Sequence, residues 1–177
     1  MLDFKTIQES WEYQAILDHY GDKKASRSGV PFINHIDEGV QLILKLEDFP
    51  KEIRYRAALA FCLHPMFQKP EDFNRNFELL LRFESRIVAL VIEYRNVANA
   101  CLSTSLGEEW RSFSWENINL SCRIEVNLML LADKVQNQKD FLIHHKDTHP
   151  RKEILDTYFW LWLMRLRADG YFVGDDH

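Results

Sequence analysis

Apolar residues recur every three or four positions along almost the whole chain, and this spacing constrains the fold more than any other feature. Such spacing is typical of amphipathic helices that bury one face. No stretch alternates between apolar and polar residues for long enough to form a strand. The sequence therefore predicts an all-α, compact helical bundle of about seven helices.

Each expected helix is defined by its own apolar stripe, and proline and glycine mark several of the boundaries. The stripes are Phe4, Ile7, Trp11 and Ala15; Ile33, Ile36, Val40, Ile43 and Leu44; Ile53, Ala57, Ala60 and Phe61; Phe73, Phe77, Leu80 and Leu81; Ile87, Leu90, Val91 and Tyr94; Cys122, Val126, Met129 and Leu130; and Tyr158 to Met164. Gly21 is expected to end the first helix, Pro50 to open the third, and Pro65 and Pro70 to enclose a break. A loop is expected over Cys101 to Glu116, and the seventh helix is expected to begin near Thr148-His149-Pro150 and to end at Gly170.

The length of 177 residues and the lack of a linker predict a single domain over residues 1–177, with 171–177 as a tail. A formal net charge of −5 argues against a partner that is a nucleic acid polymer, because such proteins need a surplus of Lys and Arg. A small anionic molecule needs only a local basic cluster and is not excluded.

Three cysteines without CxxC spacing indicate a reducing compartment and no disulfide framework. Cys62 and Cys122 are expected on apolar helical faces, where a free thiol behaves as a small hydrophobe. No basic, apolar leader begins the chain, and the stretch Tyr158 to Met164 is too short to span a bilayer. We therefore expect a cytoplasmic protein without a membrane partner.

The last expected helix is apolar on all sides around Trp160 and Trp162. A helix of this kind lies either in the core or in a contact between subunits. A homo-oligomer through this helix is therefore one of two expectations.

Three polar residues stand on otherwise apolar stripes and are the strongest candidates for a site. Asp133 continues the stripe of Met129 and Leu130, His64 follows Ala60 and Phe61, and His35 opens the second helix. Each could be a core group satisfied by a local hydrogen bond. Together, two imidazoles and one carboxylate could instead hold a divalent metal ion such as Mn, Fe or Zn with positions left open.

Three segments resemble the hydrolase domain of the RelA/SpoT-type (p)ppGpp alarmone hydrolases, which are helical enzymes of the HD-domain superfamily. The segments are Arg27–His35 (RSGVPFINH), Ala57–His64 (AALAFCLH) and Leu130–Asn137 (LLADKVQN), and the similarity spans roughly residues 20–145. The resemblance implies an HD-like fold in which His35, His64 and Asp133 bind metal. It further implies that Arg27 and Asn137 contact a nucleotide.

Other basic residues surround these positions. Lys23 and Lys24 precede Arg27 in the loop before His35, and Lys134 adjoins Asp133. They form either a solvated turn or a clamp for phosphate. The run His144, His145 and His149 is interpreted as a solvated helix start.

The family signature His-Asp-x-x-Glu-Asp is degenerate in this chain, which has His64-Pro65-Met66-Phe67-Gln68-Lys69 instead. Pro65 has no group that ligates a cation, an amide at Gln68 cannot act as a base, and Lys69 would repel a metal ion. No residue is therefore assigned a catalytic role at these positions. Glu38 and the acids after Pro70 are the neighbours that could substitute.

The first hypothesis is a nucleotide-binding protein that senses or sequesters a small phosphorylated nucleotide without hydrolysis. Compact HD-like proteins of this size occur in phage genomes, where sequestering a host signalling nucleotide would be useful; this step is analogy. The alternatives are a metal-dependent nucleotide phosphohydrolase with a rewired single-metal site, and a structural or protein-interaction domain.

Overall fold

The computed structural model describes residues 3–25, 28–104 and 112–172, and these residues form an all-α fold, as the periodicity predicts. Eight α-helices lie within them: α1 (Phe4–Gln8), α2 (Trp11–Tyr20), α3 (Phe32–Lys45), α4 (Lys51–Phe67), α5 (Pro70–Asn76), α6 (Ser85–Ala100), α7 (Ile124–Asp140) and α8 (Lys152–Ala168). Two 3-10 segments, η1 (Phe77–Arg82) and η3 (Trp115–Asn117), and one π-helical turn, η4 (Phe141–His145), complete them. The described part of the chain has no β-strand, and its β-type pairing is an isolated bridge between Lys24 and Pro31.

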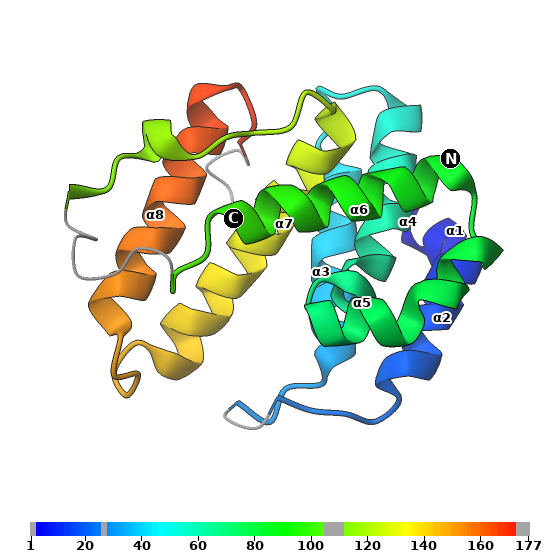
Figure 1. The fold of residues 1–177 in the computed structure, drawn as a ribbon, viewed down its shortest axis with the longest axis horizontal. Coiled ribbons are helices and arrows are strands. Elements are labelled where there is room, and N and C mark those ends of the chain that lie inside the picture. The colour runs from blue at the N-terminus through cyan, green and yellow to red at the C-terminus, as the bar shows by residue number, and fades with distance from the viewer. Residues whose placement is uncertain (1–2, 26–27, 105–111, 173–177) are drawn as a thin grey trace.

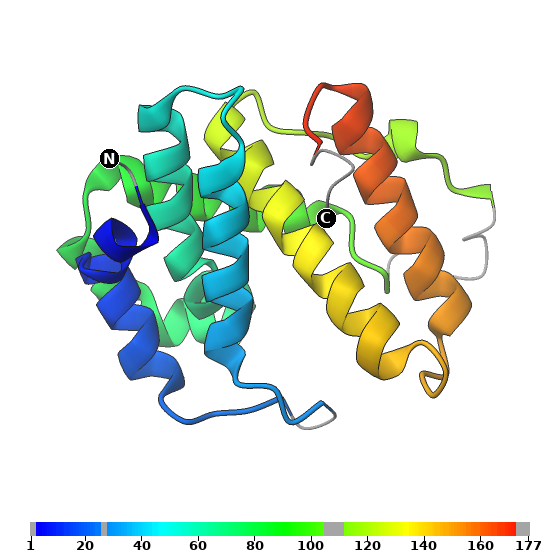
Figure 2. The same cartoon turned by 180° about the vertical axis from the view of Figure 1, so that it is seen from behind.

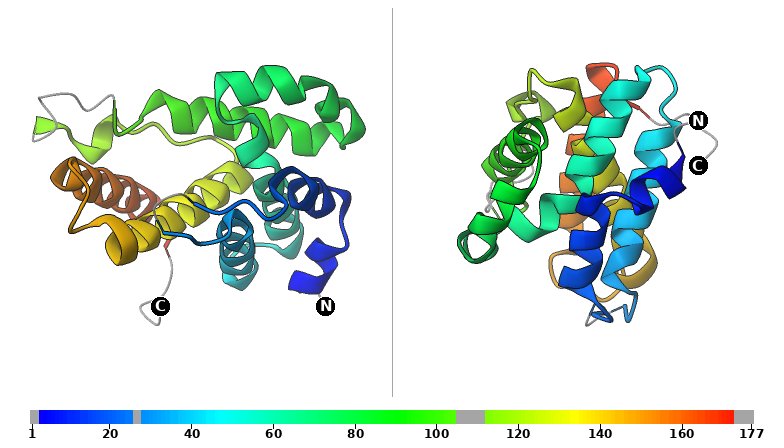
Figure 3. Two further views of the ribbon diagram at one scale, coloured as in Figure 1. Left: turned by 90° about the horizontal axis from the view of Figure 1, so that it is seen from below. Right: turned by 90° about the vertical axis from the view of Figure 1, so that its right-hand side faces the viewer.

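Helix α4 is the centre of the bundle, and it contacts α2, α3, α6 and α7 (Figure 1). An unbroken run from Ala57 to His64 is buried on all sides of this helix. A helix that is apolar all round needs neighbours all round. Helix α6 crosses α4 and α7 as a separate layer, seen edge-on in Figure 3, while α8 packs mainly on α7. Helices α3, α4 and α7 each contact the other two.

The first expected helix is two helices, so this prediction was wrong in detail. Ser10 begins a new helix because its Oγ accepts a hydrogen bond from the Tyr13 backbone N–H at 3.2 Å, as N-cap residues do. The chain changes direction there, and Trp11 is 84% exposed instead of lying on a buried stripe.

Other boundaries also differ from the sequence expectation. The third helix continues through Pro65 to Phe67, so the break begins later than expected, although Pro70 does open α5. In the next segment Phe77 and Leu81 are exposed, because a 3-10 helix has a tighter repeat that turns them away from the core. The last helix begins at Lys152 and not at Pro150.

Two side-chain expectations are settled by burial. Cys122 precedes α7 and is exposed, so its placement on an apolar helical face was wrong, whereas Cys62 is buried in α4. Trp162 is fully buried and Trp160 is half exposed, which divides the apolar surface of α8 between the core and the outside. No helix in the described ranges is long and apolar enough to cross a membrane.

Candidate metal centre and its cavity

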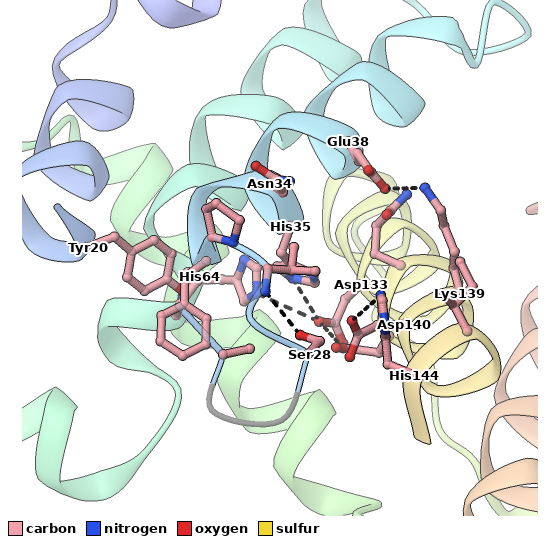
Figure 4. Close-up of a pocket in the computed structure, with 18 of the residues that line it drawn as sticks. Tyr20, Ser28, Asn34, His35, Glu38, His64, Asp133, Lys139, Asp140 and His144 are labelled. Carbon is pink, nitrogen blue, oxygen red and sulfur yellow. Dashed lines mark hydrogen bonds and ion pairs between the residues drawn. The ribbon is translucent and has the colours of Figure 1, made fainter. Parts of the chain in front are cut away.

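His35, His64 and Asp133 converge from α3, α4 and α7 (Figure 4). Their candidate metal-binding atoms all lie within 4.8 Å of one another. Asp133 Oδ1 is 3.5 Å from His35 Nε2 and 3.7 Å from His64 Nε2. His64 and Asp133 are buried, and His35 is partly accessible. Polar side chains from three different helices thus meet at one place.

The orientation of His64 depends on the proline that follows it. Proline has no N–H, so Pro65 cannot donate to the carbonyl four residues earlier, at Phe61. The Phe61 carbonyl instead lies 2.7 Å from His64 Nδ1. A carbonyl only accepts hydrogen bonds, so Nδ1 carries the proton and Nε2 keeps its lone pair. Pro65 stands where the resemblance implies an Asp. Because it lacks an N–H, it leaves the Phe61 carbonyl free to accept from His64 Nδ1 and so to orient the ring.

Two acceptors consequently face each other inside the protein. Burial lowers the pKa of His64 to about 3, so its ring is neutral at physiological pH and Nε2 holds no proton. Burial alone would raise the pKa of Asp133, but the Lys134 ammonium and the two imidazoles hold it well below its usual range. The lone pair of His64 Nε2 and the anionic Asp133 Oδ1 can both be satisfied by a cation bound between them. Two imidazole nitrogens and one carboxylate oxygen thus suit a divalent metal ion as ligands.

Lys134 lies beneath this carboxylate. Its Nζ donates to Asp133 Oδ2 at 2.8 Å and lies 5.5 and 5.1 Å from the ring centroids of Tyr158 and Trp162. Burial alone would lower the pKa of Lys134, but the adjacent carboxylate raises it. The structure places this ammonium in the core, where it balances Asp133, and outside the lining of the cavity.

Asn137 lies one helical turn after Asp133. Its Nδ2 donates to Asp133 Oδ1 at 2.8 Å, so this amide orients the carboxylate that the metal would use. Asn137 also lines the cavity, so a contact with a bound molecule is open to it as well.

A cavity of about 580 Å³ opens above the three candidate metal ligands. Pro65, Gln68 and Lys69, the three substituted positions of the motif, all line it. An aromatic pair, Tyr20 and Phe32, lies on another side with ring centroids 5.3 Å apart. The lining also includes Glu38, Lys139, Asp140 and His144.

Of the basic loop residues expected from the sequence, Lys23 and Lys24 do not line this cavity. Lys23 donates to the His19 carbonyl at 2.8 Å, Lys24 pairs its backbone with Pro31, and Arg27 falls outside the described residues. In the described part of the chain the cations of the lining are Lys69 and Lys139.

Sequence reasoning missed Asp140 and His144, which lie on the same side of the chain as Asp133. Asp133, Asn137, Asp140 and His144 follow one another at helical spacing, and η4 continues α7 as a π-helical turn, a feature often found at functional sites. Asp140 Oδ1 is 4.0 Å from His144 Nε2, and Asp140 Oδ2 is 3.1 Å from His145 Nε2. The spacing was the available signal, but no apolar stripe surrounds these residues.

No family model, curated protein or solved structure matches this chain. The resemblance to the alarmone hydrolases therefore rests on the three sequence segments alone.

Proposed function

We propose that this chain holds one divalent metal ion on His35, His64 and Asp133 and, with it, binds a small phosphorylated nucleotide that it senses or sequesters without hydrolysis. The observation that carries the proposal is the pair of facing acceptors, His64 Nε2 and Asp133 Oδ1, 3.7 Å apart in the core. Asp133 Oδ1 already accepts from Asn137 Nδ2, and a cation between the two atoms would bind the remaining lone pair of that oxygen together with the lone pair of His64 Nε2.

The charges of the cavity make phosphate binding depend on the metal. Lys69 and Lys139 face two carboxylates of the same lining, Glu38 and Asp140, and Lys139 Nζ is already 2.7 Å from Glu38 Oε2. Asp133 is balanced by Lys134 underneath. The residues alone thus supply little net positive charge, and a bound dication supplies the excess that an anion needs.

The size and walls of the cavity suit a nucleotide. Its volume of about 580 Å³ falls within the usual range for small-molecule sites, roughly 300–1,000 Å³. Tyr20 and Phe32 offer aromatic surface for a base, and stacking of that kind contributes about 1–3 kcal/mol per base.

Retention without hydrolysis follows from the three substituted positions. A hydrolase needs a group that accepts a proton from the attacking water within hydrogen-bond reach. Gln68 and Lys69 line the cavity where the resemblance expects acids, and neither an amide nor an ammonium is a base there. Their side chains are donors, which suits binding of phosphate oxygens.

The test uses the purified chain with its metal content measured. We expect close to one metal ion per chain, and a nucleotide that raises the melting temperature only when that metal is present. His64→Gln should abolish both effects, whereas Lys152→Gln, a change on the exposed start of α8, should alter neither. If neither metal nor any nucleotide shifts the melting temperature, the binding proposal is wrong and a structural role remains.

A second candidate is a metal-dependent nucleotide phosphohydrolase with a rewired single-metal site. It is favoured by Asp140 and His144, a carboxylate and an imidazole 4.0 Å apart in the same lining, which could orient a water molecule. Product released from a nucleotide at a rate that Asp140→Asn reduces at least tenfold would establish this candidate in place of the first. The absence of product with metal-loaded protein would reject it.

A further inference from the structure

A second cavity, of about 910 Å³, adjoins the first along α7. Figure 2 shows α7 running between α3 and α8 on this side of the molecule. We call this second cavity the groove. The two cavities share the residues of their common wall, which are Glu38, Gln136, Lys139 and Ile143. A molecule bound in one can therefore extend into the other.

The lining of the groove is more apolar than polar, and most of its apolar residues are aliphatic. It includes Leu42, Leu46, Leu131, Val135, Leu142 and Leu163. Ile143 on the common wall is 62% exposed and Leu142 is 43% exposed, so apolar surface is open to a bound molecule. Phe172, 51% exposed, also lines the groove. Aliphatic walls of this kind favour a hydrocarbon chain over a nucleobase, whose edges need hydrogen bonds.

The charged residues that line the groove are mostly cationic. Lys45, Lys139 and Arg167 line it against a single carboxylate, Glu38. The ion pair between Lys139 and Glu38 lies on the common wall, and both side chains are about half exposed. A phosphate that enters from the metal side meets Lys139 there, and the groove carries a further positive charge beyond it.

We propose that the groove binds the aliphatic chain of the same molecule whose phosphate the metal cavity holds, so that the preferred molecule is an amphiphilic phosphate ester. This inference rests on the proposed function. It narrows the class of bound molecule to a phosphate that carries a long hydrocarbon chain, either directly, as in a lipid phosphate, or through a nucleotide.

The test measures affinity for a series of n-alkyl phosphates, from ethyl to octyl, with the metal-loaded protein below micelle-forming concentrations. Each methylene that enters the groove should tighten binding roughly fourfold. Octyl phosphate should then bind at least a hundredfold more tightly than ethyl phosphate, whereas 1-octanol should bind no more tightly than ethyl phosphate. Comparing AMP with its octyl phosphodiester shows whether the chain is carried by a nucleotide or by a simple phosphate.

Matched variants test whether the hydrocarbon chain of the bound molecule lies in the groove. Leu142→Asp places a charge in the groove and should reduce the octyl-to-ethyl affinity ratio at least tenfold. Leu81→Asp, a change at an 82% exposed leucine of η1 that lines neither cavity, should leave the ratio unchanged. Circular dichroism confirms that both variants fold.

The outcomes separate this inference from the proposed function. If ethyl and octyl phosphate bind equally well and both need metal, the groove proposal is wrong and the metal-dependent phosphate site stands. If octanol binds as tightly as octyl phosphate, the groove is independent of the phosphate site and the inference fails. If neither alkyl phosphate binds with metal but a nucleotide does, the groove proposal is wrong and the proposed function stands. If no nucleotide binds either, both fail. A dimer that forms with rising concentration and is lost in Leu142→Asp would assign the groove to a second copy of the chain and overturn the inference.

Discussion

Replacing Pro65 by alanine should raise the stability of the protein and weaken its metal binding at the same time. Alanine restores an N–H that can donate to the Phe61 carbonyl, which His64 Nδ1 now contacts at 2.7 Å. The regained helical bond would compete with the hydrogen bond that fixes the ring. Opposite signs for the two effects make this variant informative.

The magnitudes follow from the position of Pro65 in α4. One helical hydrogen bond contributes about 1 kcal/mol, and alanine exceeds proline by about 3 kcal/mol in a helix interior. Pro65 lies close to the end of α4, at Phe67, so only part of the second figure applies. Alanine also frees the unfolded chain, which costs about 0.4–1 kcal/mol. The net gain should be about 1–3 kcal/mol, or a melting temperature higher by about 2–12 °C.

Loss of a hydrogen bond that orients a metal ligand typically costs about 10–100-fold in affinity. Metal affinity is measured by competition with a fluorescent chelator, and stability by urea unfolding of the chelator-treated protein. Pro70→Ala is the matched control, because Pro70 is the first residue of α5, where a missing N–H has no helical partner to lose. Metal affinity of Pro65→Ala within twofold of the original chain, or a less stable variant, would refute the reasoning.

Three further outcomes are expected. Asp133→Asn leaves the Lys134 ammonium buried without its carboxylate and should cost about 3–5 kcal/mol in urea unfolding, most of which Lys134→Met should restore; a loss below about 1 kcal/mol would contradict the buried pair. Under native conditions only the thiol of the exposed Cys122 should react rapidly with a thiol reagent, whereas all three thiols should react after denaturation. Two or three rapidly reacting thiols in the native protein would contradict the burial of Cys62 and Cys101. Gly39→Ala should cost about 1–3 kcal/mol although alanine favours helices, because a methyl group would press on the fully buried Phe61 ring; an unchanged urea midpoint would show that the ring can move.

Most of the fold could be predicted because five long helices carry continuous apolar stripes. The errors arose where a single hydrogen bond or a small change of helical repeat determines where a helix begins or which side chains are buried. Ser10 divides the first stripe through its contact with the Tyr13 N–H, and the 3-10 segment after Asn76 turns Phe77 and Leu81 outward. Apolar periodicity is unchanged by either event, so it cannot report them.

The candidate site, too, could be predicted only in part from the sequence. His35, His64 and Asp133 could be found because a polar group on an apolar stripe needs a partner, and the structure brings all three together. The role of Lys134 could not be found, because neighbouring residues on a helix point in directions about 100° apart. One faces the cavity and the other faces Tyr158 and Trp162. Asp140 and His144 are partly exposed, and polar residues at an accessible position give no such signal.

Asp133 lies far along the chain from His35 and His64, and this separation has a kinetic consequence. The site is complete only after α7 has docked against α3 and α4, since Asp133 lies in α7. Contacts between distant segments form slowly because the loop between them must close first. Metal added during refolding should therefore be captured no earlier than this docking step. An ion bound after that step would slow the opening of the bundle.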